Sequence, residues 1–274
     1  MHRDKNEMEG IDLEPHTDFL GWMYHYMREI KMDYIGKFSN RPFIWVEYSH
    51  AMGNSNGNFK DLWDMVYQER QMQGGFIWDF VDQGLAEFKD GKKYWAYGGD
   101  YSSEEYNNDT NFCMNGLVNP DRTPHPALEE VKHVYQDVKF SLNQNGDKIV
   151  VDNRYFFKNI ENHQILLELV ADGVVVDKFL TKINLHPQKT KLIDNPFLNN
   201  SFSNYLEYFI NVYLYSENDT PLVGSNHVLS KDQIFIKSAI LVDKEIKNSK
   251  KLKIKEDNYE IKLLNNDVEI VFNK

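Results

Sequence analysis

One carboxylate, Glu47, lies at a position where catalytic side chains are often found. Glu47 directly follows the apolar run Phe43–Val46, which predicts a strand buried on both faces. A carboxylate at the carboxyl end of such a strand is costly to bury unless it is hydrogen-bonded or used. In an α/β barrel this end of the strands is the active-site face. Glu47 is therefore a candidate catalytic group, with a structural ion pair as the alternative.

The neighbours of Glu47 favour a ligand site. Residues 48–55 (YSHAMGNS) are mostly small or polar and include a glycine, so this loop can bring its backbone close to a ligand. His50 can donate to a substrate hydroxyl, although a lone histidine is more often structural. Trp78 ends the next apolar run and suits the apolar face of a sugar ring, with ordinary core packing as the alternative.

Other chemistries find less support in the residues. Ser49 is not surrounded by a nucleophile elbow, and Cys113 has no context that would activate a thiolate. No spacing typical of zinc ligands is present. Residues 98–100 (GGD) are too short for a phosphate loop.

The elements that position Glu47 alternate between strand and helix. Apolar residues from Phe59 to Tyr67 recur at helical spacing, and the predicted helix is capped by Ser55 or Asn58 and ended by Gly74-Gly75. A second buried strand is predicted over Phe76–Val81, which completes a βαβ unit. Upstream, we expect a strand over Asp18–Tyr24 and a helix over Met27–Phe38.

The rest of the chain predicts strands without helices. Asp172-Gly173 between two apolar runs is a strong hairpin signal. About seven short strands in roughly 100 residues favour an immunoglobulin-like sandwich. The clearest candidates are Lys148–Phe157, Ile165–Val170, Val174–Val176, Tyr208–Tyr215 and His227–Ile236. The tail from Leu241 adds two predicted strands, Tyr259–Leu264 and Val268–Phe272.

Composition limits the classes of function. The 274 residues carry a net charge of −11, which argues against nucleic-acid binding because phosphates need a basic face. A single cysteine excludes an internal disulfide framework. No apolar run approaches membrane-spanning length, so no membrane partner is expected. The polar start shows no secretory signal, which leaves cytoplasm and periplasm both open.

Four motifs in order resemble the β-galactosidases of glycoside hydrolase family two, in particular the bacterial lactose-operon type. They are residues 47–55 (EYSHAMGNS), 74–83 (GGFIWDFVDQ), 97–100 (YGGD) and 111–118 (NFCMNGLV), the last followed by 121–128 (DRTPHPAL). The resemblance implies the C-terminal portion of a (β/α)8 TIM barrel over residues 1–130. It further implies an immunoglobulin-like β-sandwich over 138–240. A linker and the start of a truncated β-sandwich stub would then occupy 241–274.

The same resemblance implies roles for individual residues. Glu47 matches the catalytic nucleophile of a retaining enzyme, and Tyr24 matches a tyrosine that hydrogen-bonds it. The implied substrate-binding residues are His50, Trp78 and Asn108. The carbonyl of Phe112 and the side chain of Asn115 match ligands of a sodium ion near the sugar 6-hydroxyl.

The resemblance also implies that parts of the family's site lie elsewhere. The acid/base glutamate follows an asparagine in this family, and Asn6-Glu7 lies in a charged segment without a strand pattern. The magnesium ligands have no match either. We therefore expect an internal fragment of a longer, homo-oligomeric β-galactosidase that is inactive alone.

Two other functions remain open from the sequence. A β-glucuronidase or β-mannosidase of the same family is one, although no basic cluster for a glucuronate carboxylate sits beside these motifs. A non-catalytic carbohydrate-binding or assembly module is the other, although residues 138–240 contain no tryptophan for sugar stacking.

Overall fold

The computed structural model describes residues 17–36, 41–101, 107–200, 206–217, 222–238, 252–265 and 268–274. The chain divides into two compact units, Met1–Lys139 and Phe140–Lys274. Within the described ranges, no helix is both long and apolar enough to cross a membrane.

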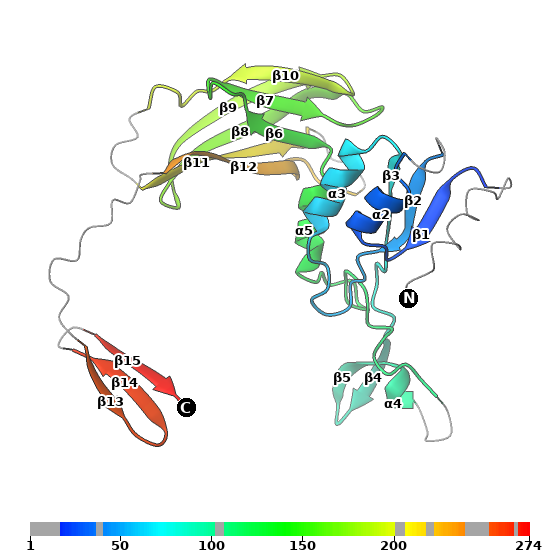
Figure 1. Cartoon of the computed structure of the whole chain (residues 1–274). Coiled ribbons are helices and arrows are strands. Elements are labelled where there is room, and N and C mark those ends of the chain that lie inside the picture. The colour runs from blue at the N-terminus through cyan, green and yellow to red at the C-terminus, as the bar shows by residue number, and fades with distance from the viewer. Residues whose placement is uncertain are drawn as a thin grey trace. The chain divides into compact units, whose positions relative to one another are not determined.

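A parallel three-stranded sheet forms the centre of the first unit (Figure 1). Its strands lie in the order β1 (Leu20–Met23), β2 (Phe43–Tyr48) and β3 (Met72–Ile77). Helix α2 (Met27–Asp33) follows β1, and helix α3 (Phe59–Gln68) follows β2. The predicted strand–helix alternation is therefore confirmed, with the connections expected of parallel strands.

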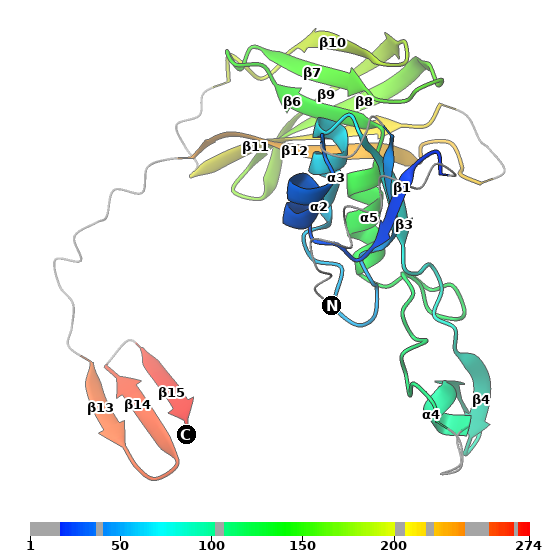
Figure 2. The same ribbon diagram turned by 45° about the vertical axis from the view of Figure 1, so that its right-hand side comes forward.

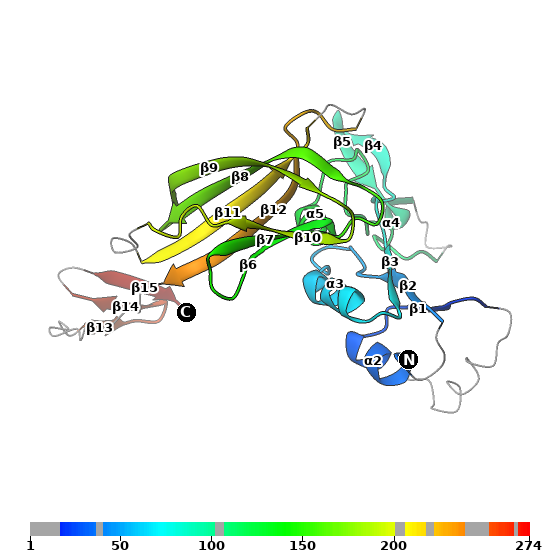
Figure 3. The same ribbon diagram turned by 90° about the horizontal axis from the view of Figure 1, so that it is seen from above.

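Three helices cover one face of this sheet, and the views in Figures 1 and 3 agree on this arrangement. The core beneath them joins Phe43 and Trp45 of β2 with residues of α2, α3 and the later helix α5 (Ala127–Tyr135). On the other face, Val46 is 44% exposed and Phe76 is 66% exposed. The expectation that these strands are buried on both faces is wrong for the described residues, since helices cover only one side.

Several predicted boundaries also shift. Helix α2 ends at Asp33 instead of Phe38, which lies outside the described residues. Helix α3 ends at Gln68, and Gly74-Gly75 belong to β3 instead of ending the helix. Asn58 occupies the N-cap of α3 without a side-chain cap, because its φ of 60° is left-handed. The hydroxyl of Ser55 instead donates to the carbonyls of its own loop.

The sequence reading missed three elements of the first unit. A hairpin joins β4 (Leu85–Lys89) to β5 (Lys92–Ala96), and the short helix α4 (Gly98–Tyr101) follows. Helix α5 crosses residue 130, where the barrel portion was predicted to end, and so lies across the predicted domain break before residue 138. Since Val131 and Val134 of α5 are buried in the first unit's core, that break is corrected to the end of α5 or later.

Two of the antiparallel sheets in the second unit lie against each other, as Figure 2 shows. One has the order β10-β7-β6 and the other β12-β11-β8-β9. Their bounds are β6 (Val138–Leu142), β7 (Lys148–Asn153), β8 (Ile160–Ala171), β9 (Val174–Leu185), β10 (Lys189–Asp194), β11 (Glu207–Tyr215) and β12 (Val228–Ser238). The hairpin at Asp172-Gly173 is confirmed between β8 and β9. The immunoglobulin-like assignment stays a prediction.

Alternation builds the core of the second unit. Residues 208, 210, 212 and 214 of β11 are buried, while their neighbours are only partly buried. The matching row on β8 includes Ile165, Leu167 and Leu169. This period of two is typical of strands with one face toward a core.

Near the C-terminus, β13 (Lys253–Glu256), β14 (Glu260–Leu264) and β15 (Glu269–Asn273) form an antiparallel sheet. The predicted strands beginning at Tyr259 and Val268 correspond to β14 and β15, while β13 was not predicted. The role of residues 241–274 as the start of a further domain stays a prediction.

Candidate active site

Glu47 lies on β2 at its carboxyl end, one residue before the strand finishes. Strict alternation from Phe43 and Trp45 would place Glu47 in the row that faces the helices. The register of β2 with β3 shifts between Trp45 and Tyr48, however, and Tyr48 takes the buried position. Such an irregularity re-aims side chains beside active sites. It leaves the Glu47 carboxylate partly exposed, outside the core.

Tyr24 lies directly beside Glu47, because β1 and β2 are parallel neighbours. Its side-chain hydroxyl is hydrogen-bonded to the Glu47 carboxylate. Its backbone N–H donates to the Glu47 carbonyl at 2.9 Å. Burial of the hydroxyl, this hydrogen bond and the negative charges of Glu47 and Asp79 together raise the pKa of Tyr24 well above its ordinary value. The hydroxyl therefore remains a proton donor to Glu47 at neutral pH.

His50 lies across from Tyr24. Its ring stacks on Phe112 with a centroid distance of 5.1 Å and contacts Tyr24 at 6.1 Å. The Nε2 atom of His50 is buried and has no hydrogen-bond partner. Because an unpaired buried nitrogen is costly, this atom is suited to bind a ligand group.

Trp78 follows β3 and is held to the same strand ends. Its N–H donates to the carbonyl of Tyr48 at 3.0 Å, and its carbonyl accepts from Ala51 at 2.7 Å. The peptide bond between Trp78 and Asp79 is cis. The indole is 39% exposed, so it is not consumed by core packing.

Asp79 is a second carboxylate of this region that was not predicted as a site residue. It contributes to the raised pKa of Tyr24 through its charge. Its Oδ1 accepts from the Val81 N–H at 2.8 Å, and its Oδ2 accepts from Gln83 Nε2 at 2.6 Å. Its place beside Trp78 in the second motif is the signal that could have identified it.

The segment 113–118 runs alongside residues 79–83. Asp79 N–H donates to the Asn115 carbonyl at 2.8 Å, and Gln83 N–H donates to the Cys113 carbonyl at 2.9 Å. Asn115 is only 2% exposed, and its Oδ1 has no hydrogen-bond partner. An orphaned buried acceptor of this kind fits a hard cation such as Na⁺, which prefers oxygen ligands.

Asn108 lies in the loop that leads to Phe112. Together with Asp109, Thr110 and Phe112 it lines a hollow of about 380 Å³. Its Oδ1 accepts from the Thr110 N–H at 2.9 Å, so this oxygen serves the loop itself. Among the described residues, no hydrogen bond or ring contact joins Asn108 to Glu47.

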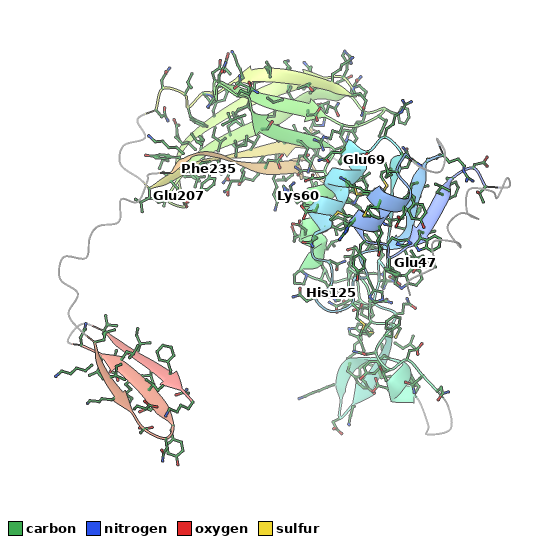
Figure 4. All side chains as sticks on the ribbon, viewed as in Figure 1. Glu47, Lys60, Glu69, His125, Glu207 and Phe235 are labelled. Carbon is green, nitrogen blue, oxygen red and sulfur yellow. The ribbon has the colours of Figure 1, made fainter. Side chains whose placement is uncertain are left out.

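The structure thus brings Tyr24, Glu47, His50 and Phe112 together through direct contacts. Trp78 and Asn115 are tied to the same strand ends through the backbone. Figure 4 labels Glu47 beside the three-stranded sheet, above the β4–β5 hairpin in this view. Within the part of the chain that the structure describes, no group of three or more His, Cys, Asp or Glu side chains is arranged to hold a metal ion.

Both units match known families. Residues 12–140 match the family described as "Glycosyl hydrolases family 2, TIM barrel domain". Residues 149–237 match the one described as "Beta-galactosidase, domain 4".

Similar proteins carry the corresponding name. The chain is 36% identical over 281 residues to a protein named beta-galactosidase from Pseudoalteromonas haloplanktis, covering 94% of this chain and 27% of that protein. A beta-galactosidase from Photobacterium profundum is 39% identical over 197 residues, which are 70% of this chain and 19% of that protein. One from Yersinia pestis is 42% identical over 154 residues, 56% of this chain and 14% of that protein. The chain therefore spans at most 27% of the length of these relatives.

The site geometry and the matches over both units lead to one assignment: the chain belongs to glycosyl hydrolase family 2.

Proposed function

We propose that this chain carries the nucleophile side of a retaining β-galactosidase site, with Glu47 as the nucleophile. The observation that carries this proposal is the hydrogen bond from the Tyr24 hydroxyl to the Glu47 carboxylate at the carboxyl end of β2. Relatives named beta-galactosidase support galactosides as the substrate class.

The proposed reaction has two displacements. A Glu47 carboxylate oxygen attacks the anomeric carbon, and the bond from that carbon to the leaving oxygen breaks as this oxygen takes a proton from an acid. The sugar is then held as an ester on Glu47. Water, deprotonated by the same group acting as base, attacks the anomeric carbon and frees Glu47 again. Tyr24 stabilises the free carboxylate before and after the ester exists.

The remaining residues of the site bind the sugar in this proposal. The exposed indole of Trp78 offers an apolar face to the ring. The Nε2 of His50, which is unpaired among the described residues, binds a sugar hydroxyl. This hydrogen bond would offset the free-energy cost of burying the nitrogen without a partner. Asn108 is a further binding residue through the loop that it shares with Phe112.

A sodium ion is the cofactor that the residues fit. The Asn115 Oδ1 and the Phe112 carbonyl would hold it, and the ion would position a sugar hydroxyl by accepting its oxygen as a ligand. Magnesium, by contrast, is proposed to bind residues other than those that the structure describes.

We also propose that the acid/base carboxyl comes from residues outside these 274. Asp79 is a poor candidate, because both its oxygens already accept hydrogen bonds from Val81 and Gln83. A chain of these 274 residues alone would then lack the 10²- to 10⁴-fold that general acid–base catalysis typically supplies, and would hydrolyse galactosides at most weakly.

The test is covalent capture of the nucleophile. The complete natural polypeptide that contains these residues is incubated with a 2-deoxy-2-fluoro-β-galactosyl fluoride, whose sugar ester hydrolyses slowly. We expect peptide mass spectrometry to find the sugar on Glu47, and on no peptide of a Glu47→Gln variant. Glu69→Gln is the matched control, since Glu69 pairs with Lys31 on the surface. Sugar on another carboxylate, or turnover by the 274-residue chain alone, would contradict the proposal.

A further inference from the structure

The geometry points to Asp82 and His125 as a pair that positions Asn115 for its cation. This inference rests on the proposed function, because the cation is part of that proposal. Neither residue touches the reacting atoms, so both act through the segment 113–118 that carries Asn115.

Asp82 is a buried carboxylate with two specific partners. It is 5% exposed, which is unusual for an acidic residue and costly without compensation. Its Oδ1 accepts the Gly116 N–H at 2.7 Å. Its Oδ2 lies 3.3 Å from His125 Nε2. The carboxylate thus joins the residue directly after Asn115 to His125.

Gly116 is pressed against the strand end where Asp82 lies. A Cβ atom at this position would lie 2.1 Å from the Asp82 nitrogen and 2.3 Å from the Val81 carbonyl carbon, distances that real side chains do not adopt. Only glycine permits this approach, which brings its N–H within reach of the Asp82 carboxylate. The backbone on either side of the Asn115 side chain is therefore held at short range.

His125 ties this arrangement to helix α5. Its N–H donates to the Leu117 carbonyl at 3.0 Å, and its carbonyl accepts from the Leu128 N–H at 3.0 Å at the start of the helix. Figure 4 labels His125 near the lower end of helix α5. The imidazole is 28% exposed and lines a cavity of about 540 Å³ on its other side. Asp82 and His125 therefore link the Asn115 segment to a helix anchored in the core.

The Oδ1 atom of Asn115 is the part of this frame that no described residue satisfies. Its carbonyl accepts from Asp79, and its neighbour Gly116 donates to Asp82, yet Oδ1 remains unpaired. A cation site needs its ligands held within about 0.5 Å of the productive geometry by surrounding hydrogen bonds. Asp82 and His125 supply that support, and a purely structural ion pair is the competing explanation.

The experiment measures Na⁺ binding without relying on turnover. The complete natural polypeptide is melted in NaCl and in choline chloride at equal ionic strength, over a series of salt concentrations. A bound ion stabilises the folded state by RT ln(1 + [Na⁺]/Kd), so the way the Tm difference between the two salts grows with Na⁺ concentration gives the Kd, which is the half-saturating Na⁺ concentration. The variants are Asp82→Asn, His125→Gln and Asn115→Ala, with Asp194→Asn as a matched loss of a surface ion pair.

We expect Asp82→Asn and His125→Gln to raise the half-saturating Na⁺ concentration at least fivefold. Asn115→Ala should abolish the Na⁺-specific difference, and Asp194→Asn should leave it unchanged. A purely structural pair would lower Tm equally in both salts and leave the half-saturating concentration as in the wild type, which would overturn the inference. If Asp82→Asn does not fold, His125→Gln decides, since its side chain is partly exposed.

Capture of the sugar on Glu47 in the same preparation separates this inference from the proposed function. Labelled Glu47 without any Na⁺-specific stabilisation overturns the positioning role and leaves the nucleophile standing. If Glu47 is not labelled, but Asp82→Asn and His125→Gln both raise the half-saturating Na⁺ concentration, the proposed nucleophile is wrong and the positioning role is supported.

Discussion

Asn115 in the first unit and Asn153 in the second are both almost fully buried, at 2% and 0% exposure, but they are used differently. The Nδ2 group of Asn153 donates to three backbone carbonyls, of Lys158, Leu185 and His186, at 3.1–3.2 Å. Its Oδ1 accepts the Tyr155 N–H at 3.1 Å. Asn115, by contrast, has an Oδ1 without a partner. One asparagine joins loops to strands, whereas the other leaves an acceptor unpaired among the described residues.

Left-handed backbone conformations occur at non-glycine residues of both units, and two of them lie at the strand ends of the first unit. In the second unit the left-handed residues include Asp172 and Asn226, residue types that tolerate this region and lie in turns. In the first unit Tyr24 and Ser49 have φ values of 56° and 51° at the ends of β1 and β2. Non-glycine residues held in this region often mark functional sites. The first unit thus holds unpaired polar atoms and backbone strain at its strand ends.

The largest expected effect is the loss of activity when the proposed nucleophile is replaced, which tests whether the chemistry lies in the first unit. Replacing Glu47 with Gln keeps the shape of the side chain and removes its ability to attack. We expect hydrolysis of a nitrophenyl β-galactoside by the complete polypeptide to fall by at least ~10³-fold. Tm should stay within a few degrees, because the carboxylate is partly exposed. A variant with near wild-type turnover would place the chemistry elsewhere.

The two asparagines can be compared directly. Asn153→Ala leaves buried backbone carbonyls without donors, so we expect it to lower the free energy of unfolding by about 3 kcal/mol. In sodium-free buffer, Asn115→Ala removes an oxygen that has no partner among the described residues and should cost less than about 1 kcal/mol. Urea unfolding followed by circular dichroism measures both. Equal losses of unfolding free energy in the two variants would show that the two asparagines do not differ in their contribution to stability.

Loss of the Tyr24 hydroxyl is expected to have an intermediate effect. Tyr24→Phe removes a hydrogen bond to a charged group, worth about 1.5–3 kcal/mol, so kcat/KM should fall about 10- to 100-fold. Steady-state kinetics at neutral pH tests this. An unchanged kcat/KM would mean that Glu47 is stabilised by other groups.

The raised pKa of Tyr24 predicts that the stability difference between wild type and Tyr24→Phe depends on pH. The pKa of Tyr24 in the folded chain lies above its ordinary value of 10.0. The hydroxyl therefore stabilises the folded state fully below about pH 10, and this contribution is lost as the pH rises further. The stability difference between wild type and Tyr24→Phe should shrink between pH 9 and pH 11 in urea titrations. A difference that is constant over this range would contradict the assigned shift.

The smallest effect is expected on the surface of the second unit. Asp194 pairs with Lys148, and its side chain is 85% exposed. Exposed ion pairs contribute about 0–1 kcal/mol, so Asp194→Asn should change the free energy of unfolding by less than about 0.5 kcal/mol and turnover not at all. A larger loss of unfolding free energy would show that this exposed ion pair contributes more to the stability of the second unit than we expect.

Much of the fold followed from local patterns. The helical spacing from Phe59 to Tyr67 marked α3, and Asp172-Gly173 marked the β8–β9 hairpin. Alternation marked β11. These signals depend on residues close together in the chain. Helix α5 was missed because the prolines and charged residues around it conceal a short apolar stripe that includes Val131 and Val134.

Sequence alone determined which residues are candidates for the site. Glu47 is a carboxylate that follows an apolar strand, and the family resemblance points to Tyr24, His50, Trp78 and Asn115. Only the tertiary structure decided how they meet. The irregularity in β2 that turns Glu47 away from the helices arises from pairing with β1 and β3. The contact of Asp82 with Gly116 joins residues 34 positions apart. Local spacing carries no information about such pairings, because they are set by packing between strands that are distant in the chain.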